Sequence, residues 1–437
     1  MGRAIALVLV ACLASCYQSP SLASCKYRCG GANNNSCPSG FECNAGMCVA
    51  PGDQCDGDGG VIDAPDVSDS LIDMSTIDAT MCPNPDVNMW VPQPTLSTGT
   101  TLKQIVVLDG NNDNKVDLVA LDEIDEIGFF AGKGNGTFDA RQETIVSPVA
   151  ALLSKRVVTG DFDRDGQRDD LLVLQTGDNE LAIMASLGNG LFSRTSVLLG
   201  ANVADFGSAG DVDGNGREDV IVMYSGATSR LEVLLQTDVS PFWGAGTMVA
   251  TNQNATSVFV GKVNGNNITD AIVTMTGTGQ MGLHVGSGTS PFGLSGLTVA
   301  NVPSPVQAVA GQLRPSGTPS IVTVSTSASN VTTKHINGVS GTTDGDTIAV
   351  GTSPKAVILA NVVGSALPEI ITADSGSNQF TVLLNEDGNF ADAVLTPTGT
   401  TPSDLVAADF DADGRLDLAV ANVGSQTISI FLNKCQP

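Results

Sequence analysis

The sequence DFDADGRLD at residues 409–417, followed at once by LAVA at 418–421, decides the fold of this chain. It is one of four intact copies of a nine-residue acidic pattern, and each copy runs into an apolar, strand-like stretch. The other three copies begin at Asp109, Asp161 and Asp211. The same frame continues with fewer acids from Lys262, Gln312 and Asn361.

The seven copies recur at a nearly constant interval, with steps of 52, 50, 51, 50, 49 and 48 residues. A period near fifty indicates a repeat architecture. One unit, residues 152–200, contains four strand-like stretches separated by turns rich in Gly and Asn. Four short antiparallel strands make one blade of a β-propeller, and rings of roughly 4–8 blades are known. The sequence therefore predicts an all-β fold, a seven-bladed β-propeller of four-stranded antiparallel blades within residues 82–437.

The last unit lacks its outermost strand, and a spare strand-like segment at residues 90–98 precedes the first unit. We expect this segment to pair with residues 427–432, because an unpaired sheet edge would otherwise remain. Cys82 and Cys435 flank the two segments, and we predict a disulfide between them. On the chain-entropy model, closing so long a loop contributes about 4–5 kcal/mol.

The N-terminal region has the features of an exported protein. Residues 1–15 fit a signal peptide, and the sequence LASC ending at Cys16 resembles a bacterial lipobox, which predicts lipidation of Cys16. Ordinary cleavage after Ala23, giving a secreted protein, is the alternative. Residues 16–55 form a predicted disulfide-rich module and residues 56–81 an acidic flexible linker. The module's six cysteines allow fifteen pairings, among which the sequence does not choose: Cys25, Cys29, Cys37, Cys43, Cys48 and Cys55.

The charge of the chain limits its partners. Lys and Arg total 20 against 46 Asp and Glu, a net charge of −26. This balance argues against nucleic acid, and against a membrane surface except through the lipid anchor. The chain has two histidines, His284 and His335, and this composition argues against a histidine-rich metal site and against histidine-based catalysis.

The acidic pattern offers the hard oxygen ligands that calcium prefers. Positions 1, 3, 5 and 9 supply carboxylate or amide oxygens, and position 7 would supply its backbone carbonyl. Position 6 is Gly or Asn, which tolerate a left-handed backbone. An EF-hand is excluded, because position 12 is apolar and lies in a strand. The predicted ligands of about four calcium ions are Asp109, Asn111, Asp113, Lys115, Asp117, Asp161, Asp163, Asp165, Gln167, Asp169, Asp211, Asp213, Asn215, Arg217, Asp219, Asp409, Asp411, Asp413, Arg415 and Asp417.

Nine-residue acidic loops entering Asp-Leu-Val every fifty residues resemble the FG-GAP/VCBS repeats of integrin α-chains and many bacterial surface proteins. The resemblance covers residues 90–437 and implies a calcium-bearing propeller. Blades four to six depart from it at Lys262, Gln312 and Asn361, and we expect no calcium there. Lys262 would either place its ammonium where the ion would sit or face solvent.

These features predict a calcium-stabilised surface or adhesion scaffold that recognises an extracellular protein or glycan. No residue set for catalysis is recognisable, and calcium is expected to stabilise the blades. One alternative is a polysaccharide lyase or hydrolase, for which Asp122 with Glu123, and Asp125 with Glu126, are the candidate carboxylates. A lectin is the other alternative, with Trp243 in an exposed turn as the candidate stacking residue.

Overall fold

The computed structural model describes residues 42–44, 47–49 and 89–435, the last range without 124–125, 147–152, 177–179, 200–204, 225–228, 238–242, 245, 252–254, 265–267, 287–296, 300, 316 and 338–340. The predicted signal peptide, Cys16, the linker and Cys82 lie outside the described residues. The chain divides into two compact units, residues 1–63 and 64–437. In the described part of the chain, no helix has the length and apolarity needed to cross a membrane.

In the first unit the described residues form one hairpin, β1 (Glu42–Asn44) with β2 (Met47–Val49). Its antiparallel register places Cys43 opposite Cys48. The other four cysteines of the predicted module lie outside the described residues. Their pairing therefore stays a prediction.

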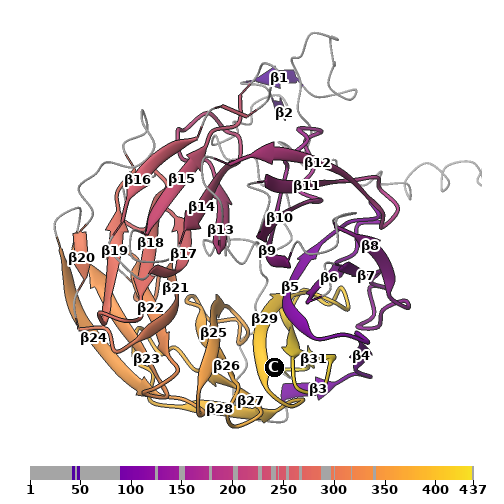
Figure 1. The fold of residues 1–437 in the computed structure, drawn as a ribbon. Coiled ribbons are helices and arrows are strands. Elements are labelled where there is room, and N and C mark those ends of the chain that lie inside the picture. Colours follow the sequence, from indigo (N-terminus) through magenta and orange to yellow (C-terminus); the bar gives the residue numbers. More distant parts are fainter. Residues whose placement is uncertain are drawn as a thin grey trace, which may run out of the picture. The chain divides into compact units, whose positions relative to one another are not determined.

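The second unit is a ring of seven antiparallel sheets (Figure 1). The first three blades are β5–β8, β9–β12 and β13–β16, in chain order from the centre outward. Their strands are β5 (Leu102–Leu108), β6 (Asp117–Asp122), β7 (Glu126–Phe130), β8 (Gln142–Ile145), β9 (Leu153–Gly160), β10 (Asp170–Thr176), β11 (Glu180–Ser186), β12 (Phe192–Leu198), β13 (Phe206–Gly210), β14 (Asp219–Tyr224), β15 (Arg230–Leu234) and β16 (Thr247–Ala250).

The remaining four blades are β17–β20, β21–β24, β25–β28 and β29–β31. Their strands are β17 (Ala255–Gly261), β18 (Asp270–Met275), β19 (Gln280–His284), β20 (Leu297–Val299), β21 (Pro305–Gly311), β22 (Ser320–Ser325), β23 (Asn330–Ile336), β24 (Thr342–Ala349), β25 (Pro354–Ala360), β26 (Glu369–Asp374), β27 (Gln379–Leu383), β28 (Ala393–Pro397), β29 (Pro402–Ala408), β30 (Asp417–Asn422) and β31 (Thr427–Asn433). The predicted seven-bladed propeller is confirmed.

Burial of a strand depends on its position within the blade. Every residue is buried in six of the second strands: β6, β14, β18, β22, β26 and β30. Both faces of these strands pack against neighbouring blades, which is why their sequences are apolar runs without alternation. The outer strands β8 and β24 are largely exposed. Blade-to-blade packing of the inner layers is therefore the hydrophobic core of the ring.

The ring closes as predicted. The segment β3 (Trp90–Pro92) and β4 (Leu96–Ser97) pairs antiparallel with β31 and supplies the missing outer strand of blade seven. Trp90 is opposite Asn433 and Ser97 is opposite Thr427. The backbone amide of Lys434 also donates to the carbonyl of Met89 (2.7 Å). Sequence-distant ends of the ring are thus hydrogen-bonded in one sheet.

Candidate metal centres

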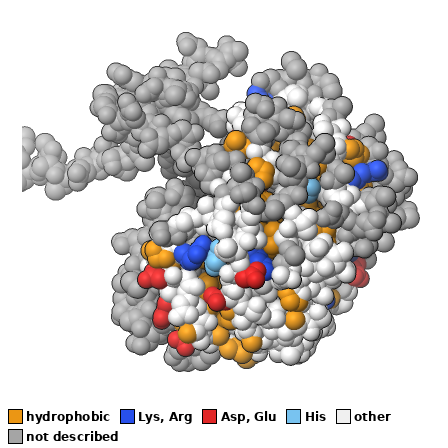
Figure 2. Space-filling model, turned by 90° about the vertical axis from the view of Figure 1, so that its left-hand side faces the viewer, with side chains coloured by type: hydrophobic (Ala, Val, Ile, Leu, Met, Phe, Trp, Pro, Cys, Tyr) orange, Lys and Arg blue, Asp and Glu red, His pale blue; other side chains and the backbone are white. Residues whose placement is uncertain are grey.

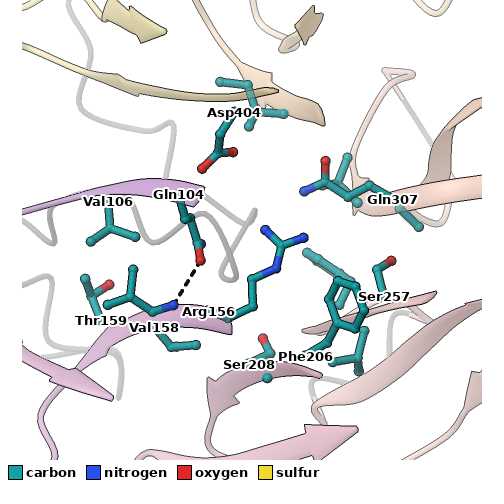
Figure 3. A pocket seen from close by; sticks show the side chains of 17 residues that line it. Gln104, Val106, Arg156, Val158, Thr159, Phe206, Ser208, Ser257, Gln307 and Asp404 are labelled. Atoms are coloured by element: carbon teal, nitrogen blue, oxygen red, sulfur yellow. Dashed lines mark hydrogen bonds between the residues drawn. The ribbon is translucent and has the colours of Figure 1, made fainter. Parts of the chain in front are cut away.

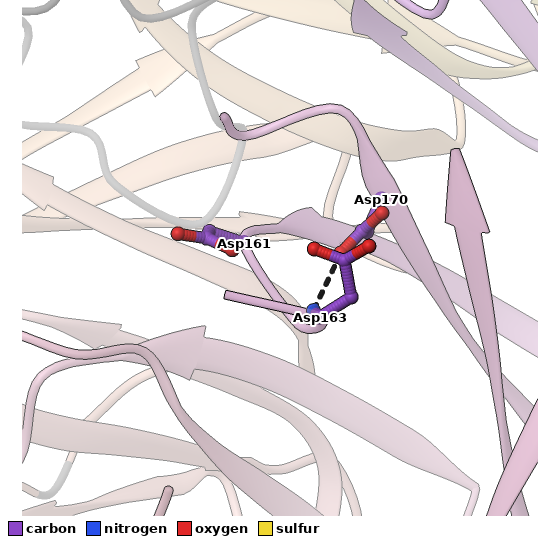
Figure 4. A group of neighbouring side chains, drawn as sticks. All are labelled: Asp161, Asp163 and Asp170. Carbon is purple, nitrogen blue, oxygen red and sulfur yellow. Dashed lines mark hydrogen bonds between the residues drawn. The ribbon is translucent and has the colours of Figure 1, made fainter. Parts of the chain in front are cut away.

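The acidic loops connect the first and second strands of their blades and therefore lie at one end of the ring. Three groups of carboxylates have oxygens within 4.8 Å of one another, which could hold a metal ion. The groups are Asp161, Asp163 and Asp170; Asp211, Asp213 and Asp219; and Asp409, Asp411 and Asp417. Figure 4 shows the group of blade two. The first loop has the amide of Asn111 in place of the second acid, so it contributes fewer carboxylates.

Two left-handed residues curl each loop. Position 6, as predicted, has positive φ: 59° at Asn114, 91° at Gly166, 78° at Gly216 and 85° at Gly414. Position 4 shares this conformation, which the sequence analysis missed because its residues have no common type. Its φ values are 58° at Asn112, 72° at Arg164, 79° at Gly214 and 60° at Ala412. A non-glycine residue in this region is uncommon, so the tight curl imposes a backbone cost at position 4.

The acids at positions 1 and 5 accept hydrogen bonds from the loop's own backbone. In blade seven, Asp409 accepts from the amides of Asp413 (3.1 Å) and Gly414 (2.8 Å), and Asp413 accepts from Arg415 (3.0 Å). The first three loops make related bonds: Asp109 accepts from the amide of Asp113 (3.0 Å), and Asp161 accepts from the amide of Arg164 (2.7 Å). In the third loop the amide oxygen of Asn215 takes the place of the acid at position 5 and accepts from Arg217 (2.8 Å). These bonds hold the carboxylates in a converging arrangement.

The acid at position 9 begins the second strand and links two parts of its blade. Asp417 accepts from the amides of Phe410 (2.8 Å) and Asn433 (2.7 Å), and Asp117 accepts from Gly110 (3.0 Å) and Gly132 (2.7 Å). Each carboxylate therefore joins the start of its own loop to the end of the third strand. This link is a structural role that metal ligation does not require.

Blade two departs from the predicted frame by one residue. Asp170, and not Asp169, pairs with Gly160 at the start of the second strand and accepts from the amides of Phe162 (2.8 Å) and Ser186 (2.8 Å). Asp169 is buried with one carboxylate oxygen lacking a hydrogen-bond partner among the described residues. The loop is one residue longer than its counterparts, which the repeated spacing concealed. Asp170 thus takes the place in the carboxylate group that the sequence predicted for Asp169, and two adjacent acids were the visible signal.

Burial raises the pKa of each acid that begins a second strand. The pKa is raised to about 7 for Asp117, Asp170 and Asp417 and to about 6 for Asp219. Desolvation is the largest cause, and the other acids of the loop contribute by repulsion, while backbone hydrogen bonds oppose the shift. A cation at these groups would relieve both unfavourable effects.

The donor sets fit a hard divalent cation. In blade seven, Asp411 Oδ1 is buried and has no hydrogen-bond partner in the described part of the chain. A buried carboxylate oxygen without a partner is costly, and coordination would satisfy it. The ammonium of Lys434 contacts Asp411 and lies 3.1 Å from Asp413 Oδ2, and Arg415 also pairs with Asp413. Two cationic side chains therefore already surround this cluster.

Blades four to six keep the fold of the loop with fewer acids. Asp270 accepts from the amides of Val263 (3.1 Å) and Gly286 (2.9 Å), and Glu369 accepts from Val362 (2.9 Å). In blade five Ser320 replaces the acid and bonds to His335 Nδ1 (2.9 Å). Lys262 is exposed, which agrees with the solvent-facing alternative. The surface seen from the side of β20 and β24 is mostly neutral with scattered charges (Figure 2).

The residues suggested for the two alternative functions are buried or partly buried. Asp122 is fully buried, lies 2.8 Å from the Arg141 guanidinium and accepts a 2.8 Å hydrogen bond from the Thr100 hydroxyl. Glu126 is also near Arg141 (3.7 Å), whereas Asp125 lies outside the described residues. Trp243 is not an exposed platform, because it is partly buried and packs against Phe162 with ring centroids 6.3 Å apart.

Cys435 is buried and takes part in a disulfide. The predicted partner, Cys82, lies outside the described residues, so the identity of the bridge stays a prediction. Its position fits a covalent closure of the ring, since Cys435 follows the strand that pairs with residues 90–97.

Comparisons with known proteins agree with this architecture. Residues 109–172 and 364–420 match the model of the FG-GAP-like repeat family. No curated protein sequence matches the chain. These two stretches therefore match FG-GAP-like repeats, and the second unit is a seven-bladed β-propeller.

Solved structures with the same fold share little sequence identity with this chain. BBS1N, crystallised in complex with ARL6DN, is 11% identical with a TM-score of 0.57, covering 80% of this chain and 98% of that one. Virginiamycin B lyase from Staphylococcus aureus is 11% identical with a TM-score of 0.55, covering 78% and 99%. The WD40 β-propeller domain of Doa1 is 11% identical with a TM-score of 0.51, covering 78% and 96%. Identities this low show the fold alone.

Proposed function

We propose that this protein is an exported, calcium-stabilised binding scaffold that recognises an extracellular protein or glycan. The observation that carries the proposal is the repeated convergence of carboxylates in loops of one architecture. Calcium favours six to eight hard oxygen ligands in a flexible shell, and loops of carboxylates and amides supply such ligands. The resemblance to FG-GAP/VCBS repeats supports calcium over other hard cations.

Calcium, when bound, would supply positive charge to clustered carboxylates and fix the connection between the first two strands. The residues that would hold it are the carboxylates or amides at positions 1, 3 and 5, the backbone carbonyl at position 7 and the acid that begins the second strand. The chain's own backbone already orients these groups through the hydrogen bonds of Asp109, Asp161, Asp211 and Asp409. Occupancy would therefore complete a preorganised loop.

Binding is favoured over catalysis on the chemistry of the described residues. One acid of each pair suggested for a polysaccharide-acting enzyme, Asp122 and Glu126, lies near Arg141, and the buried Asp122 has a structural role there. Propellers of the same fold include BBS1N in a protein complex and a lyase, so the fold permits either role. A lyase or hydrolase remains the alternative, since propellers place catalytic groups on loops.

The first test is binding of residues 24–437 to a glycan array and to whole cells, with calcium and with chelator. We expect binding in calcium that is lost with chelator. Glycan signals would identify a lectin, and cell binding without glycan signals would identify protein adhesion. Absence of both, in a protein that calcium stabilises, would contradict the binding proposal and favour an assay for polysaccharide cleavage.

The proposed location at the cell surface depends on Cys16. A lipidated protein should fractionate with membranes and incorporate labelled fatty acid, and Cys16→Ser should abolish both. A control, Cys12→Ser, changes the neighbouring cysteine of the leader and should leave both unchanged. Soluble export of the wild-type protein would contradict the anchor and support cleavage after Ala23.

A further inference from the structure

The centre of the ring holds a small polar cavity. It has a volume of about 80 Å³ and is lined by the inner strands of all seven blades. Figure 3 shows that Arg156 extends into it, toward Gln104, Gln307 and Asp404. A cavity of this size holds several water molecules or one small ligand, since a water needs roughly 10–15 Å³ on this measure.

The polar groups belong to a belt of residues at one level of the ring. Each of the seven inner strands contributes to this belt the residue four positions before its last residue, so equivalent register places the seven residues at the same height. We call these seven residues the channel belt: Gln104, Arg156, Phe206, Ser257, Gln307, Ala356 and Asp404. Two residues further along, the strands carry mostly buried apolar residues, including Val158, Phe259 and Ile358. The belt therefore lies next to a layer of mostly apolar side chains.

Hydrogen bonds between blades orient the amides of the belt. Gln104 Oε1 accepts from the backbone amide of Val157 (2.9 Å), and Gln307 Oε1 accepts from that of Val357 (2.8 Å). Because a backbone amide requires an acceptor, the oxygen of each side chain faces the neighbouring strand and the NH₂ group is left as a donor for the cavity. Asp404 Oδ2 accepts in the same way from the backbone amide of Ile105 (3.0 Å).

Arg156 is the unusual member of the belt. Its guanidinium stacks over the ring of Phe206, 4.9 Å from the centroid. Among the described residues it makes no hydrogen bond and no ion pair, and Asp404 lies on the other side of the cavity (Figure 3). Stacking uses the face of the guanidinium and leaves its N–H groups, which lie in the plane, available to a ligand.

The charge distribution favours an anion here. The seven inner strands contain four cations, Lys103, Lys155, Arg156 and Lys355, and one acid, Asp404. The whole chain has 20 Lys and Arg against 46 Asp and Glu. The three lysines lie one residue before the belt, near the starts of the strands. The acidic loops follow the ends of the strands, about 13 Å from the belt at 3.3 Å per residue.

We propose that the central cavity binds a small organic carboxylate ion that also carries a hydroxyl or ammonium group. Arg156 would take the carboxylate through paired N–H donors, a geometry that suits a planar guanidinium. The amides of Gln104 and Gln307 supply further donors. Ser208 Oγ, buried at the cavity and without a hydrogen-bond partner among the described residues, supplies another. Asp404 accepts the hydrogen of the ligand's hydroxyl or ammonium group.

This site is independent of the proposed partner recognition, and its test uses neither cells nor glycans. Calorimetric titration of the calcium-loaded full chain would use glycolate, acetate and inorganic phosphate as probes. We expect glycolate to bind most tightly and Arg156→Gln to weaken it at least tenfold. Lys133→Gln makes the same charge change at an exposed residue paired with Asp139, and should leave the affinity unchanged.

Two further variants separate the roles within the site. Arg156→Lys keeps the charge but loses the planar donor pair, so it should also weaken glycolate, and it serves if Arg156→Gln does not fold. Asp404→Asn should reduce the preference for glycolate over acetate. Equal glycolate affinity in the arginine variants, binding of phosphate alone, or no binding of any probe would overturn the proposal.

Discussion

Asp270 lies in a loop that has lost its first acid, yet its carboxylate makes the same two backbone contacts as Asp117 and Asp417. Glu369 keeps the contact to its own loop in blade six. The acid at position 9 therefore serves the fold of the blade apart from any metal. The repeat pattern in the sequence combines two roles, metal ligation and the backbone link made by the acid at position 9. Blades four and six retain the second role without the full set of acids.

Removal of this carboxylate should destabilise a blade that we expect to bind no calcium. Asp270→Ala leaves the amides of Val263 and Gly286 without their acceptor, at about 1–3 kcal/mol for each buried group. We expect a lower urea midpoint, equivalent to about 2–6 kcal/mol for the two amides, and the same loss in calcium and in chelator. Asp270→Asn retains one acceptor and should lose less. A loss confined to calcium-containing buffer would show that blade four binds metal after all.

The buried acid of blade six predicts a dependence of stability on pH. Burial raises the pKa of Glu369 to about 7 from its ordinary value of 4.5. The folded state thus binds a proton more tightly than the unfolded state, so this contribution is present below pH 4.5 and is lost as the pH rises toward 7. Glu369→Gln should flatten the fall in urea midpoint between pH 4.5 and 7.5 in chelator. An unchanged slope would mean that other groups cause it.

We predict that Lys434 competes with calcium for the carboxylates of blade seven. Its ammonium contacts Asp411 and Asp413 and is partly exposed, so the pair is worth about 0.2–1 kcal/mol. Lys434→Met should therefore raise the affinity of this loop for calcium by up to about fivefold. Lys262→Met, with the same loss of charge at an exposed residue of blade four, is the control. Equal affinities in the two variants would exclude competition by Lys434.

At the scale of the element, the sequence predicts strands well because the second strand of each blade is an apolar run after an acidic loop. The outer closure by residues 90–97 was also predictable, since one strand was missing and one was spare. The extra residue in the loop of blade two could not be predicted, because the sequence offers two identical side chains, Asp169 and Asp170. The channel belt could not be predicted either, because its seven members have no residue type in common and come together only in the folded ring.

Closure of the ring should depend on Trp90. This side chain is buried, and its ring meets that of Phe380 edge to face with centroids 5.5 Å apart. Trp90→Ala should destabilise the protein by about 3–5 kcal/mol, the usual cost of truncating a buried aromatic residue. Trp243→Ala removes a partly buried ring from blade three and should cost less. We expect the urea midpoint of Trp90→Ala to be the lower of the two. A greater loss for Trp243→Ala would contradict a major role of Trp90 in ring closure.

At the scale of the whole molecule, a net charge of −26 is gathered partly into loops at one end of the ring. The inner strands place lysines near the opposite end, so the two ends differ in charge. Self-repulsion among the acids opposes folding, and a bound cation offsets it. Stability should therefore depend on calcium more than on ionic strength, because salt screens charge without supplying ligands.

Calcium removal should lower the melting temperature without abolishing the ring. Ligand binding to the folded state stabilises it by about 2.7 kcal/mol per site at a free concentration of one hundred times the Kd. We expect about four bound ions, as the intact loops predict, by metal analysis after dialysis. Asp409→Ala should remove about one, whereas Asp270→Ala should remove none. Magnesium should restore less stability than calcium, because it demands a stricter six-ligand geometry. Solution scattering in chelator should still show a compact particle, while the melting temperature falls. That result would match a ring that apolar packing holds together and calcium stabilises further. An unchanged melting temperature would refute stabilisation by calcium.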